Sequence, residues 1–239
     1  MPANMRWFAD ALHQQIGCTV YGPRLAGHGT RPEDMRGVRW QEWYADVLAG
    51  YCMLRERCDQ VFVSGLSMGA DLCLLLAANQ SPDGVIAMST PFKIYDWRVP
   101  FIPLIKLVLP YRTKKDTDDT RQFYAYVEEQ GRKRGGSMAH YEAYPRYPTS
   151  SLKELNDLID TMRASLPRIK APVLLIHSQR DDVVPFEQFG RMVESIPCED
   201  KQTLVLEKSL LVVTLDVERI TVFESATQFI AAHTRTAVK

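Results

Sequence analysis

The stretch VFVSGLSMG, residues 61–69, decides the fold, because it runs from an apolar strand through a tight turn into a helix. Its last five residues have the pattern G-x-S-x-G, and the mostly apolar residues 70–79 predict the helix that follows. In this setting the two glycines, Gly65 and Gly69, allow a sharp turn and close packing of strand against helix. We expect the hydroxyl of Ser67 to project above the sheet and the N–H of Met68 to point to where an oxyanion would form. The alternative is a glycine-rich turn whose serine has no chemical role.

Short apolar runs alternate with longer amphipathic segments on both sides of this motif, which is typical of βαβ units around a parallel sheet. The runs lack a clean alternation of polar and apolar residues, as expected for strands covered on both faces. The predicted strands are Cys18–Tyr21, Val61–Ser64, Gly84–Met88, Val173–His177 and Thr203–Glu207. The predicted helices cover residues 3–16, 40–56, 68–79, 151–164, 186–195 and 215–232. The last helix is expected to carry Asp216 and Glu218 in its first turn, where the helix dipole favours negative charge.

Residues 91–150 interrupt this rhythm. They contain an apolar stretch with three prolines, Val99–Pro110, then a polar helical stretch near 118–130 and a Tyr/Pro-rich segment, 141–148. A long insertion between two βα units predicts a lid or cap within a single domain, residues 1–239. The alternative, a disordered excursion, would leave the apolar side chains of Val99–Pro110 in water. This stretch is too short to span a bilayer, so stable membrane insertion is not expected.

The composition is that of an ordinary globular protein, with 46% hydrophobic and 24% charged residues. Because Lys+Arg and Asp+Glu both number 29, the net charge gives no reason to expect nucleic acid or an anionic membrane surface as a partner. The five cysteines are an odd number without a CxxC pair, which favours free thiols in a reducing compartment. The N-terminus lacks a signal-peptide pattern, so a cytoplasmic protein is expected. We expect no metal and no cofactor.

A second chemical signal follows a late strand. Residues 178–185, SQRDDVVP, come directly after the predicted strand Val173–His177. A carboxylate just past a parallel strand can orient and stabilise an imidazole, which is the role of the acid in a catalytic triad. We assign this role to Asp181, with Asp182 as its neighbour. The alternative is that one of the two acids caps a helix or a turn.

From Cys18 to about His233 the sequence resembles bacterial carboxylesterases and monoacylglycerol lipases of the α/β-hydrolase fold. The matching stretches are YGPRLAGHG (21–29), WQEW (40–43), GLSMG (65–69), HSQRDDVVP (177–185) and SLLVVTLD (209–216). The resemblance implies a mostly parallel sheet with helices on both faces and an inserted lid. It also implies a serine hydrolase that cleaves small-molecule carboxylic esters with an apolar acyl chain through an acyl-enzyme on Ser67. It does not indicate the oligomeric state.

One departure from the family concerns the general base. In the resembling esterases the last stretch reads roughly Ser-Gly-His-Val, and the histidine is the base; here Leu211 occupies that position. Leucine cannot take a proton from Ser67, and a serine hydroxyl depends on such a base. Loss of the histidine from a triad costs roughly 10⁶ in kcat, or about 8–9 kcal/mol of barrier. We therefore expect impaired catalysis; the alternative is a non-catalytic relative that binds an apolar ligand or a partner.

None of the five histidines is expected to replace the missing base. His233 lies near the end of the last predicted helix, and His177 resembles a structural histidine of the family. His28 belongs to a Gly-His-Gly turn, while His13 and His140 have no motif around them.

A second departure concerns the start of the chain. The resemblance implies a strand ending in His-Gly before the first helix, and this turn would supply a second oxyanion N–H. The sequence opens with MPAN, residues 1–4, at the beginning of that helix, so we expect the first strands to be missing. The strands Cys18–Tyr21 and Val61–Ser64 would then have to close up, or leave backbone groups unpaired. A further interpretation is a fragment whose upstream sequence encodes this strand.

Overall fold

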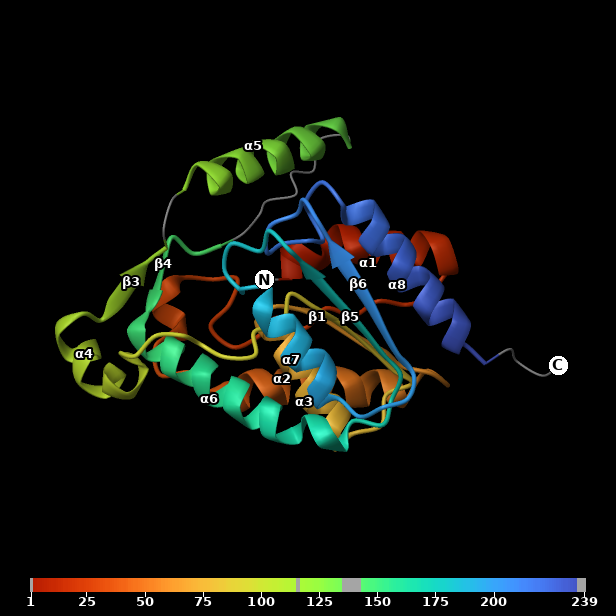
Figure 1. Cartoon of the computed structure of the whole chain (residues 1–239), viewed down its shortest axis with the longest axis horizontal. Helices are drawn as coiled ribbons and strands as arrows, with labels where there is room; N and C mark the ends of the chain where they lie inside the picture. The colour runs from red at the N-terminus through yellow and green to blue at the C-terminus, as the bar shows by residue number, and fades with distance from the viewer. Residues whose placement is uncertain (1, 115–116, 135–142, 236–239) are drawn as a thin grey trace.

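A four-stranded parallel sheet forms the centre of the computed structural model, which describes residues 2–114, 117–134 and 143–235 (Figure 1). The strand order is β1-β2-β5-β6. The strands are β1 (Phe62–Leu66), β2 (Gly84–Met88), β5 (Val173–Ser178) and β6 (Lys201–Leu206). Because all four run in the same direction, their carboxyl ends, including the end of β1 next to Ser67, lie at one edge of the sheet.

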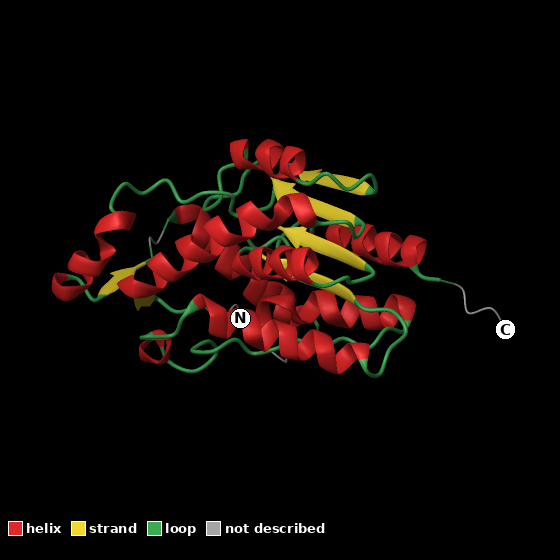
Figure 2. Cartoon of the chain, turned by 90° about the horizontal axis from the view of Figure 1, so that it is seen from below, coloured by secondary structure: helices red, strands yellow, loops and turns green. Residues whose placement is uncertain are grey.

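Helices cover both faces of the sheet, as Figure 2 shows, so the expected α/β fold class is confirmed. One face carries α2 (Trp40–Arg55), α3 (Met68–Asn79), α6 (Thr149–Ser165) and α7 (Glu187–Ser195). The other face carries α1 (Arg6–Ile16) and α8 (Arg219–His233). Short 3-10 helices occupy Pro2–Met5, Pro32–Met35, Val99–Phe101 and Leu166–Arg168. Among the described residues, no helix combines the length and apolar character that crossing a membrane requires.

The two central strands are buried on both sides, which explains their continuous apolar sequence. In β2, Val85 and Ala87 belong to the core beneath α3, while Ile86 and Met88 face the core beneath α8. Since successive side chains of a strand point to opposite faces, each strand must be apolar throughout to supply both cores.

The insertion contains its own small elements. They are α4 (Ile102–Val108), β3 (Tyr111–Thr113), α5 (Asp118–Lys133) and β4 (Arg146–Pro148). β3 and β4 form an antiparallel pair, with Tyr111 opposite Pro148. The expected helix near 118–130 is therefore present as α5, whereas part of the Tyr/Pro-rich segment 141–148 lies outside the described residues.

The apolar stretch Val99–Pro110 is covered less than we expected. Ile102 is buried, but Phe101, Leu104, Leu107 and Val108 are exposed. The insertion is ordered, yet it does not keep these side chains out of water. Their apolar character therefore gives no support to a lid.

The predicted strand Cys18–Tyr21 is wrong, because these residues form no strand in the structure. The segment and β1 line the same cavity, with Val20 and Tyr21 exposed. Paired strands lie about 4.8 Å apart, and a cavity between two segments prevents such pairing. The segment 18–21 and strand β1 therefore do not close up into a strand pair, which was one of the two outcomes we expected.

The last helix begins later than predicted, at Arg219 instead of residue 215. Asp216 and Glu218 precede its first turn and use their carboxylates elsewhere: they accept hydrogen bonds from backbone N–H groups of the loop after β6. The negative charges that suggested a helix start thus hold a loop in place.

Candidate active site

Ser67 occupies the turn between β1 and α3 in a strained backbone conformation. Its φ is 55° and its ψ is −124°, values that a residue with a side chain rarely adopts. Its N–H donates to the carbonyl oxygen of Met88 on the neighbouring strand at 2.8 Å, which anchors the turn to the sheet. Strain of this kind persists only where surrounding structure enforces it, and it is frequent at active sites.

Gly65 makes the turn sterically possible. A Cβ at this position would lie 2.2 Å from the carbonyl carbon of Gly69, far closer than such atoms approach. A Cβ on Gly69 would meet nothing within 4 Å. We expected both glycines to be needed for close packing of strand against helix, but only Gly65 lies where a side chain would not fit.

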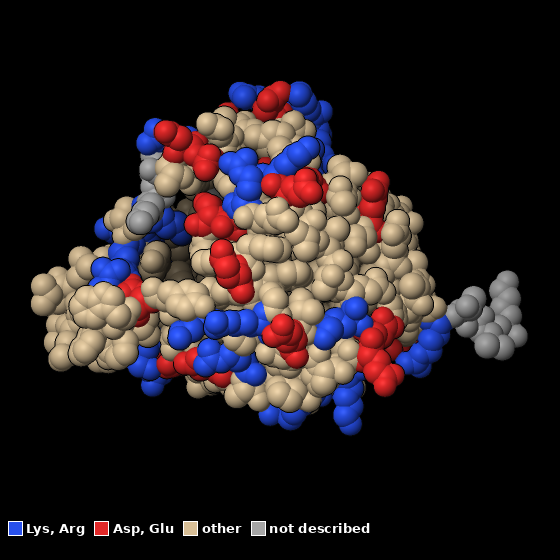
Figure 3. Space-filling model, in the orientation of Figure 1, with Lys and Arg blue, Asp and Glu red and all other residues tan. Residues whose placement is uncertain are grey.

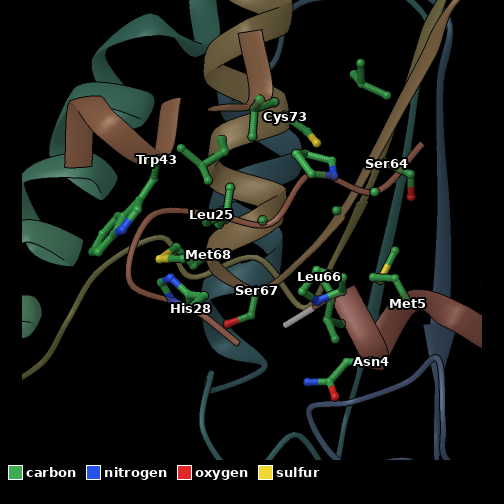
Figure 4. A pocket seen from close by; sticks show the side chains of 18 of the residues that line it. Asn4, Met5, Leu25, His28, Trp43, Ser64, Leu66, Ser67, Met68 and Cys73 are labelled. Atoms are coloured by element: carbon green, nitrogen blue, oxygen red, sulfur yellow. The ribbon is translucent and has the colours of Figure 1, made fainter. Parts of the chain in front are cut away.

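Met68 is the first residue of α3, so its N–H belongs to the free end of the helix. In the described part of the chain this N–H forms no hydrogen bond with backbone or side chain. Figure 4 shows Met68 and Ser67 side by side at the wall of a pocket. The N-terminus of α3 thus offers a donor and a partial positive charge next to the Ser67 hydroxyl.

A cavity of about 1290 Å³ opens beside Ser67. Its walls come from β1 and residues 18–23, from α1 and α2, from the insertion at Tyr95 and Tyr144, and from Leu211 in the loop after β6. The lining is predominantly apolar, which is typical of sites for small organic molecules.

Asp181 lies in the turn after β5 and is held by two backbone donors. Its Oδ1 accepts hydrogen bonds from Val183 N–H at 2.9 Å and Val184 N–H at 2.7 Å. Its Oδ2 is buried and has no hydrogen-bond partner in the described residues. Burial raises the pKa of this carboxyl, and the bonds from Val184 and Val183 counteract part of that rise. Asp181 is thus held in place through one carboxylate oxygen, and its role as the acid of a triad stays a prediction.

Leu211 lies on the cavity wall, in a loop that is fixed by acids from the following segment. Glu218 accepts hydrogen bonds from Lys208 N–H at 2.9 Å and Ser209 N–H at 2.8 Å. Asp216 accepts one from Leu210 N–H at 2.7 Å. This network could not be predicted from the sequence, because its one signal, the acidic pair Asp216 and Glu218, also resembles the first turn of a helix.

Asp182 also lies beside this loop. Its Oδ1 accepts a hydrogen bond from the backbone N–H of Leu211, with 3.4 Å between nitrogen and oxygen. The two predicted acids therefore differ in position: Asp181 is fixed within its own turn, and Asp182 joins that turn to the loop of Leu211. The structure thereby brings the segments of Asp181 and Leu211 together.

Among the described histidines, only His28 lines the cavity that contains Ser67. Its Nδ1 lies 3.0 Å from the carbonyl oxygen of Ala26, its ring meets Trp43 edge-on, and burial lowers its pKa. Figure 4 shows it near Met68. His28 thus lies on the cavity wall and is also the turn element that its sequence suggested.

The remaining histidines are engaged elsewhere. His177 is buried with Nε2 3.0 Å from the carbonyl oxygen of Val184, and Nδ1 of His13 lies 2.9 Å from that of Cys18. His233 pairs with Asp200, just before β6 and therefore at the amino edge of the sheet, opposite the edge of Ser67. His140 lies outside the described residues.

The described residues contain no cluster of three or more His, Cys, Asp or Glu side chains suited to a metal ion. All five cysteines are free.

Comparison with protein families gives a match over residues 4–210 to the family described as "Serine aminopeptidase, S33". The matched range includes Ser67 and Asp181 and ends one residue before Leu211. The sequence is 32% identical over 234 residues to a thermostable monoacylglycerol lipase from Bacillus sp. (strain H-257), covering 97% of this chain and 86% of that protein. It is 26% identical over 229 residues to a carboxylesterase from Bacillus subtilis (strain 168), covering 95% and 87%.

Solved structures agree with these relatives. A structure from work on LipS and LipT, two metagenome-derived lipolytic enzymes, aligns with a TM-score of 0.83 at 29% identity, covering 97% of this chain and 89% of that one. A soluble variant of monoglyceride lipase from Saccharomyces cerevisiae aligns with a TM-score of 0.65 at 15% identity, covering 90% and 77%. At that identity the second match shows a shared fold only.

Proposed function

This chain belongs to the serine aminopeptidase S33 family of serine hydrolases with the α/β-hydrolase fold, and we propose that it cleaves carboxylic esters through an acyl-enzyme on Ser67. The observation that carries the proposal is the position of Ser67, strained at the turn between β1 and α3 and open to an apolar cavity. The comparisons lend no support to a non-catalytic binding protein, the alternative that Leu211 suggested.

In the proposed reaction the Oγ of Ser67 attacks the ester carbonyl carbon and releases its proton to a base. The N–H of Met68 stabilises the negative charge that develops on the carbonyl oxygen. The intermediate collapses with cleavage of the bond to the alcohol oxygen, and the departing alcohol takes up a proton. Water then cleaves the bond between the acyl group and Ser67, which releases the carboxylic acid and restores the hydroxyl.

The base is the incomplete part of this proposal. The free Oδ2 of Asp181 and the side chain of Leu211 belong to adjoining segments, so an imidazole at position 211 would have an acid to orient it. Leucine supplies no such group, and we propose that the chain is a slow esterase for this reason. Removal of the histidine from a triad leaves roughly 10³–10⁴-fold catalysis over water, which comes from the oxyanion site and substrate binding.

The lining of the cavity favours esters with an apolar acyl chain, because burial of each CH₂ contributes about 0.8 kcal/mol. We propose that residues 91–150 form a lid that contributes to this cavity through Tyr95, Lys114 and Tyr144. The five free thiols suit a reducing compartment, so we place the enzyme in the cytoplasm.

The test is hydrolysis of p-nitrophenyl butyrate by the purified chain, with Ser67→Ala as the blank. Slow release of p-nitrophenol that is lost in Ser67→Ala supports the proposal. A rate equal to that of Ser67→Ala, in folded protein, contradicts it. His28→Gln shows which base serves the residual reaction: a further loss of rate identifies His28, and an unchanged rate points to solvent water.

A further inference from the structure

Strand β1 has one edge that no other described strand covers. The order β1-β2-β5-β6 places β1 at an end of the sheet, with β2 on one side only. Its other side borders the cavity, which β1 and residues 18–23 both line. Helix α3 packs on one face of β1, and Phe62 and Leu66 pack against the core beneath α8 on the other. This end of the sheet therefore lies inside the molecule.

The backbone hydrogen bonds show which groups of β1 point to the uncovered edge. The carbonyl oxygen of Val61 accepts a hydrogen bond from Asp83 N–H at 2.9 Å, and Ser67 N–H donates to the carbonyl oxygen of Met88 at 2.8 Å. In a parallel pair, residues that bond to the neighbouring strand alternate with residues whose backbone groups point away from it. Because Val61 and Ser67 bond towards β2, every second residue between them points away. We call these three residues the open edge: Phe62, Ser64 and Leu66.

The opposite end of the sheet has a different character. Strand β6 begins with Lys201, Gln202 and Thr203, and the last two are exposed. Polar side chains of this kind are usual where a sheet ends in water. Strand β1 carries no charged side chain, and the cavity beside it has a predominantly apolar lining. The sheet thus ends in water at β6, whereas at β1 it ends at an apolar space.

Two buried polar atoms beside this space also lack partners. They are the Oγ of Ser64, on the open edge, and the Oδ1 of Asn4, and neither has a hydrogen-bond partner among the described residues. Both residues line the cavity, and Figure 4 shows them at the pocket. Since buried polar groups in proteins are nearly always paired, these atoms and the open edge favour an occupant with donors and acceptors of its own.

The far wall of the space is held in place by two helices. The carbonyl oxygen of Cys18 lies 2.9 Å from Nδ1 of His13 in α1. The ring of Tyr21 packs against Gly50 of α2, where a Cβ would lie only 2.8 Å from the ring. Because contacts at Cys18 and at Tyr21 fix this segment, the space beside the open edge is formed before any occupant enters.

The cavity also reaches the surface. Lys93, Tyr95 and Lys114 of the insertion line it, and Figure 3 shows a hollow between the protruding end that carries α4 and the body of the molecule. On the far wall, Val20 and Tyr21 are exposed to solvent. A flexible molecule therefore has a way in from solvent.

We propose that the open edge binds an extended apolar peptide segment, which adds to the sheet as a further strand. Strand addition gives affinity through main-chain hydrogen bonds and selectivity through the pockets that receive alternate side chains. The N–H and C=O groups of the peptide pair with those of Phe62, Ser64 and Leu66. Its side chains point alternately towards the two cores on either side of the sheet. Because both cores are apolar, the matching peptide is apolar throughout.

Two other occupants fit this space less well. An acyl chain could fill it, but such a chain has no groups that pair with the N–H and C=O groups of the open edge. A second copy of the chain would have to insert a strand, and its own uncovered strand, β6, begins with polar residues. The proposal goes beyond ester hydrolysis, because it requires no chemistry at Ser67.

The first test is titration of the ¹⁵N-labelled chain with a heptapeptide of alternating valine and isoleucine between two terminal lysines. We expect binding, with amide hydrogen exchange of Phe62, Ser64 and Leu66 slowed at least about tenfold in the complex. The control peptide has the same side chains and carries N-methyl groups on its central residues, so these residues cannot donate hydrogen bonds. It should bind at least about tenfold more weakly.

A pair of proline variants tests the edge itself. Ser64→Pro removes the central N–H of the open edge and no bond to β2, and it should weaken peptide binding about fivefold or more. Thr203→Pro is the matched control on the other end of the sheet. The carbonyl oxygens of Asp200 and Leu206 accept hydrogen bonds from the β5 side, so the N–H of Thr203 points away from β5. Its peptide binding should equal that of the parent.

Three results with the parent chain would overturn the proposal. They are absence of peptide binding, equal binding of the N-methylated peptide, and slowed exchange in β6 instead of at the open edge. Folded Ser64→Pro protein that binds the peptide as the parent does would also contradict it. If Ser64→Pro fails to fold, the exchange measurement on the parent chain decides alone. None of these results depends on whether the chain hydrolyses esters.

Discussion

Asp181, in the turn after β5, and His177, near the end of β5, lie with 3.7 Å between Oδ2 and Nε2, yet they do not share a hydrogen bond. The histidine Nε2 faces the carbonyl oxygen of Val184 at 3.0 Å; because a carbonyl only accepts, the proton lies on Nε2 and points there. The Oδ2 of Asp181 is thus left buried and without a partner in the described chain. Buried polar atoms without partners are rare and need an explanation. We propose that Oδ2 is placed to accept a hydrogen bond from an imidazole, a group that position 211 lacks.

Asp181→Asn tests this explanation. In the parent chain we expect less than about a twofold change in ester hydrolysis, because no imidazole at position 211 depends on the acid. In Leu211→His protein the same change should lower kcat by roughly 10²–10⁴, since loss of the acid disturbs the orientation and tautomer of the base. Equal effects of Asp181→Asn in both backgrounds, measured as kcat, would show that Asp181 acts in some other way.

The two glycines around Ser67 should respond differently to alanine. A Cβ on Gly65 would lie 2.2 Å from backbone atoms of Gly69, so Gly65→Ala must displace α3 from β1. Overpacking of this kind costs about 1–3 kcal/mol, and we expect a lower Tm. Gly69→Ala meets open space and gains helix propensity, so its Tm should match or exceed that of the parent. Thermal unfolding of both variants measures the difference in Tm. Similar Tm values would show that the contact between Gly65 and Gly69 does not limit the packing of α3 on β1.

We expect Asp71 to make the stability of the protein depend on pH. It lies in α3, is fully buried, and neither carboxylate oxygen has a hydrogen-bond partner in the described residues. Burial raises the pKa of this carboxyl well above its usual value. A group with a raised folded pKa favours the folded state at a pH below its unfolded pKa, and this contribution is lost as pH rises towards the folded pKa.

We therefore expect Asp71→Asn to gain stability relative to the parent as the pH rises above the ordinary pKa of an aspartate, about 4. The limiting slope is about 1.4 kcal/mol per pH unit, that of one proton. Denaturant unfolding at several pH values measures the difference, and Asp59→Asn, at an exposed position, serves as the control. A difference between Asp71→Asn and the parent that stays constant with pH would show that Asp71 ionises normally in the folded chain.

Local patterns in the sequence predicted most of the fold. The βα turn at residues 61–79 was predicted because its signals, an apolar run, two glycines and a helix, lie within one continuous stretch. The bounds of α3, Met68–Asn79, agree with the predicted helix 68–79. The families of the relatives and of the solved structures confirm the predicted α/β-hydrolase class.

Features that depend on distant segments could not be predicted. Cys18–Tyr21 has the composition of a strand, but a strand also needs a neighbour, and a cavity separates the segment from β1. Asp216 and Glu218 resemble a helix start, and only the fold shows that loop 207–211 supplies the N–H groups they bind. The exposure of Leu107 and Val108 likewise depends on what the rest of the chain leaves uncovered.

This chain has the scaffold of a serine hydrolase, and Leu211 stands where the resembling esterases carry the imidazole of the general base. Leu211→His introduces that group on the cavity wall, in a loop fixed by Asp216 and Glu218. Leu210→His is the matched control, because Leu210 is the neighbouring leucine and packs against the core without lining the cavity.

The most direct measurement is kcat/KM for p-nitrophenyl butyrate in the parent, Leu211→His and Leu210→His. We predict a rise of about 10² or more for Leu211→His, the typical contribution of a positioned general base. The gain should disappear with Ser67→Ala, and Leu210→His should resemble the parent. Folded Leu211→His protein that is no faster than the parent would show that the missing imidazole is not what limits Ser67.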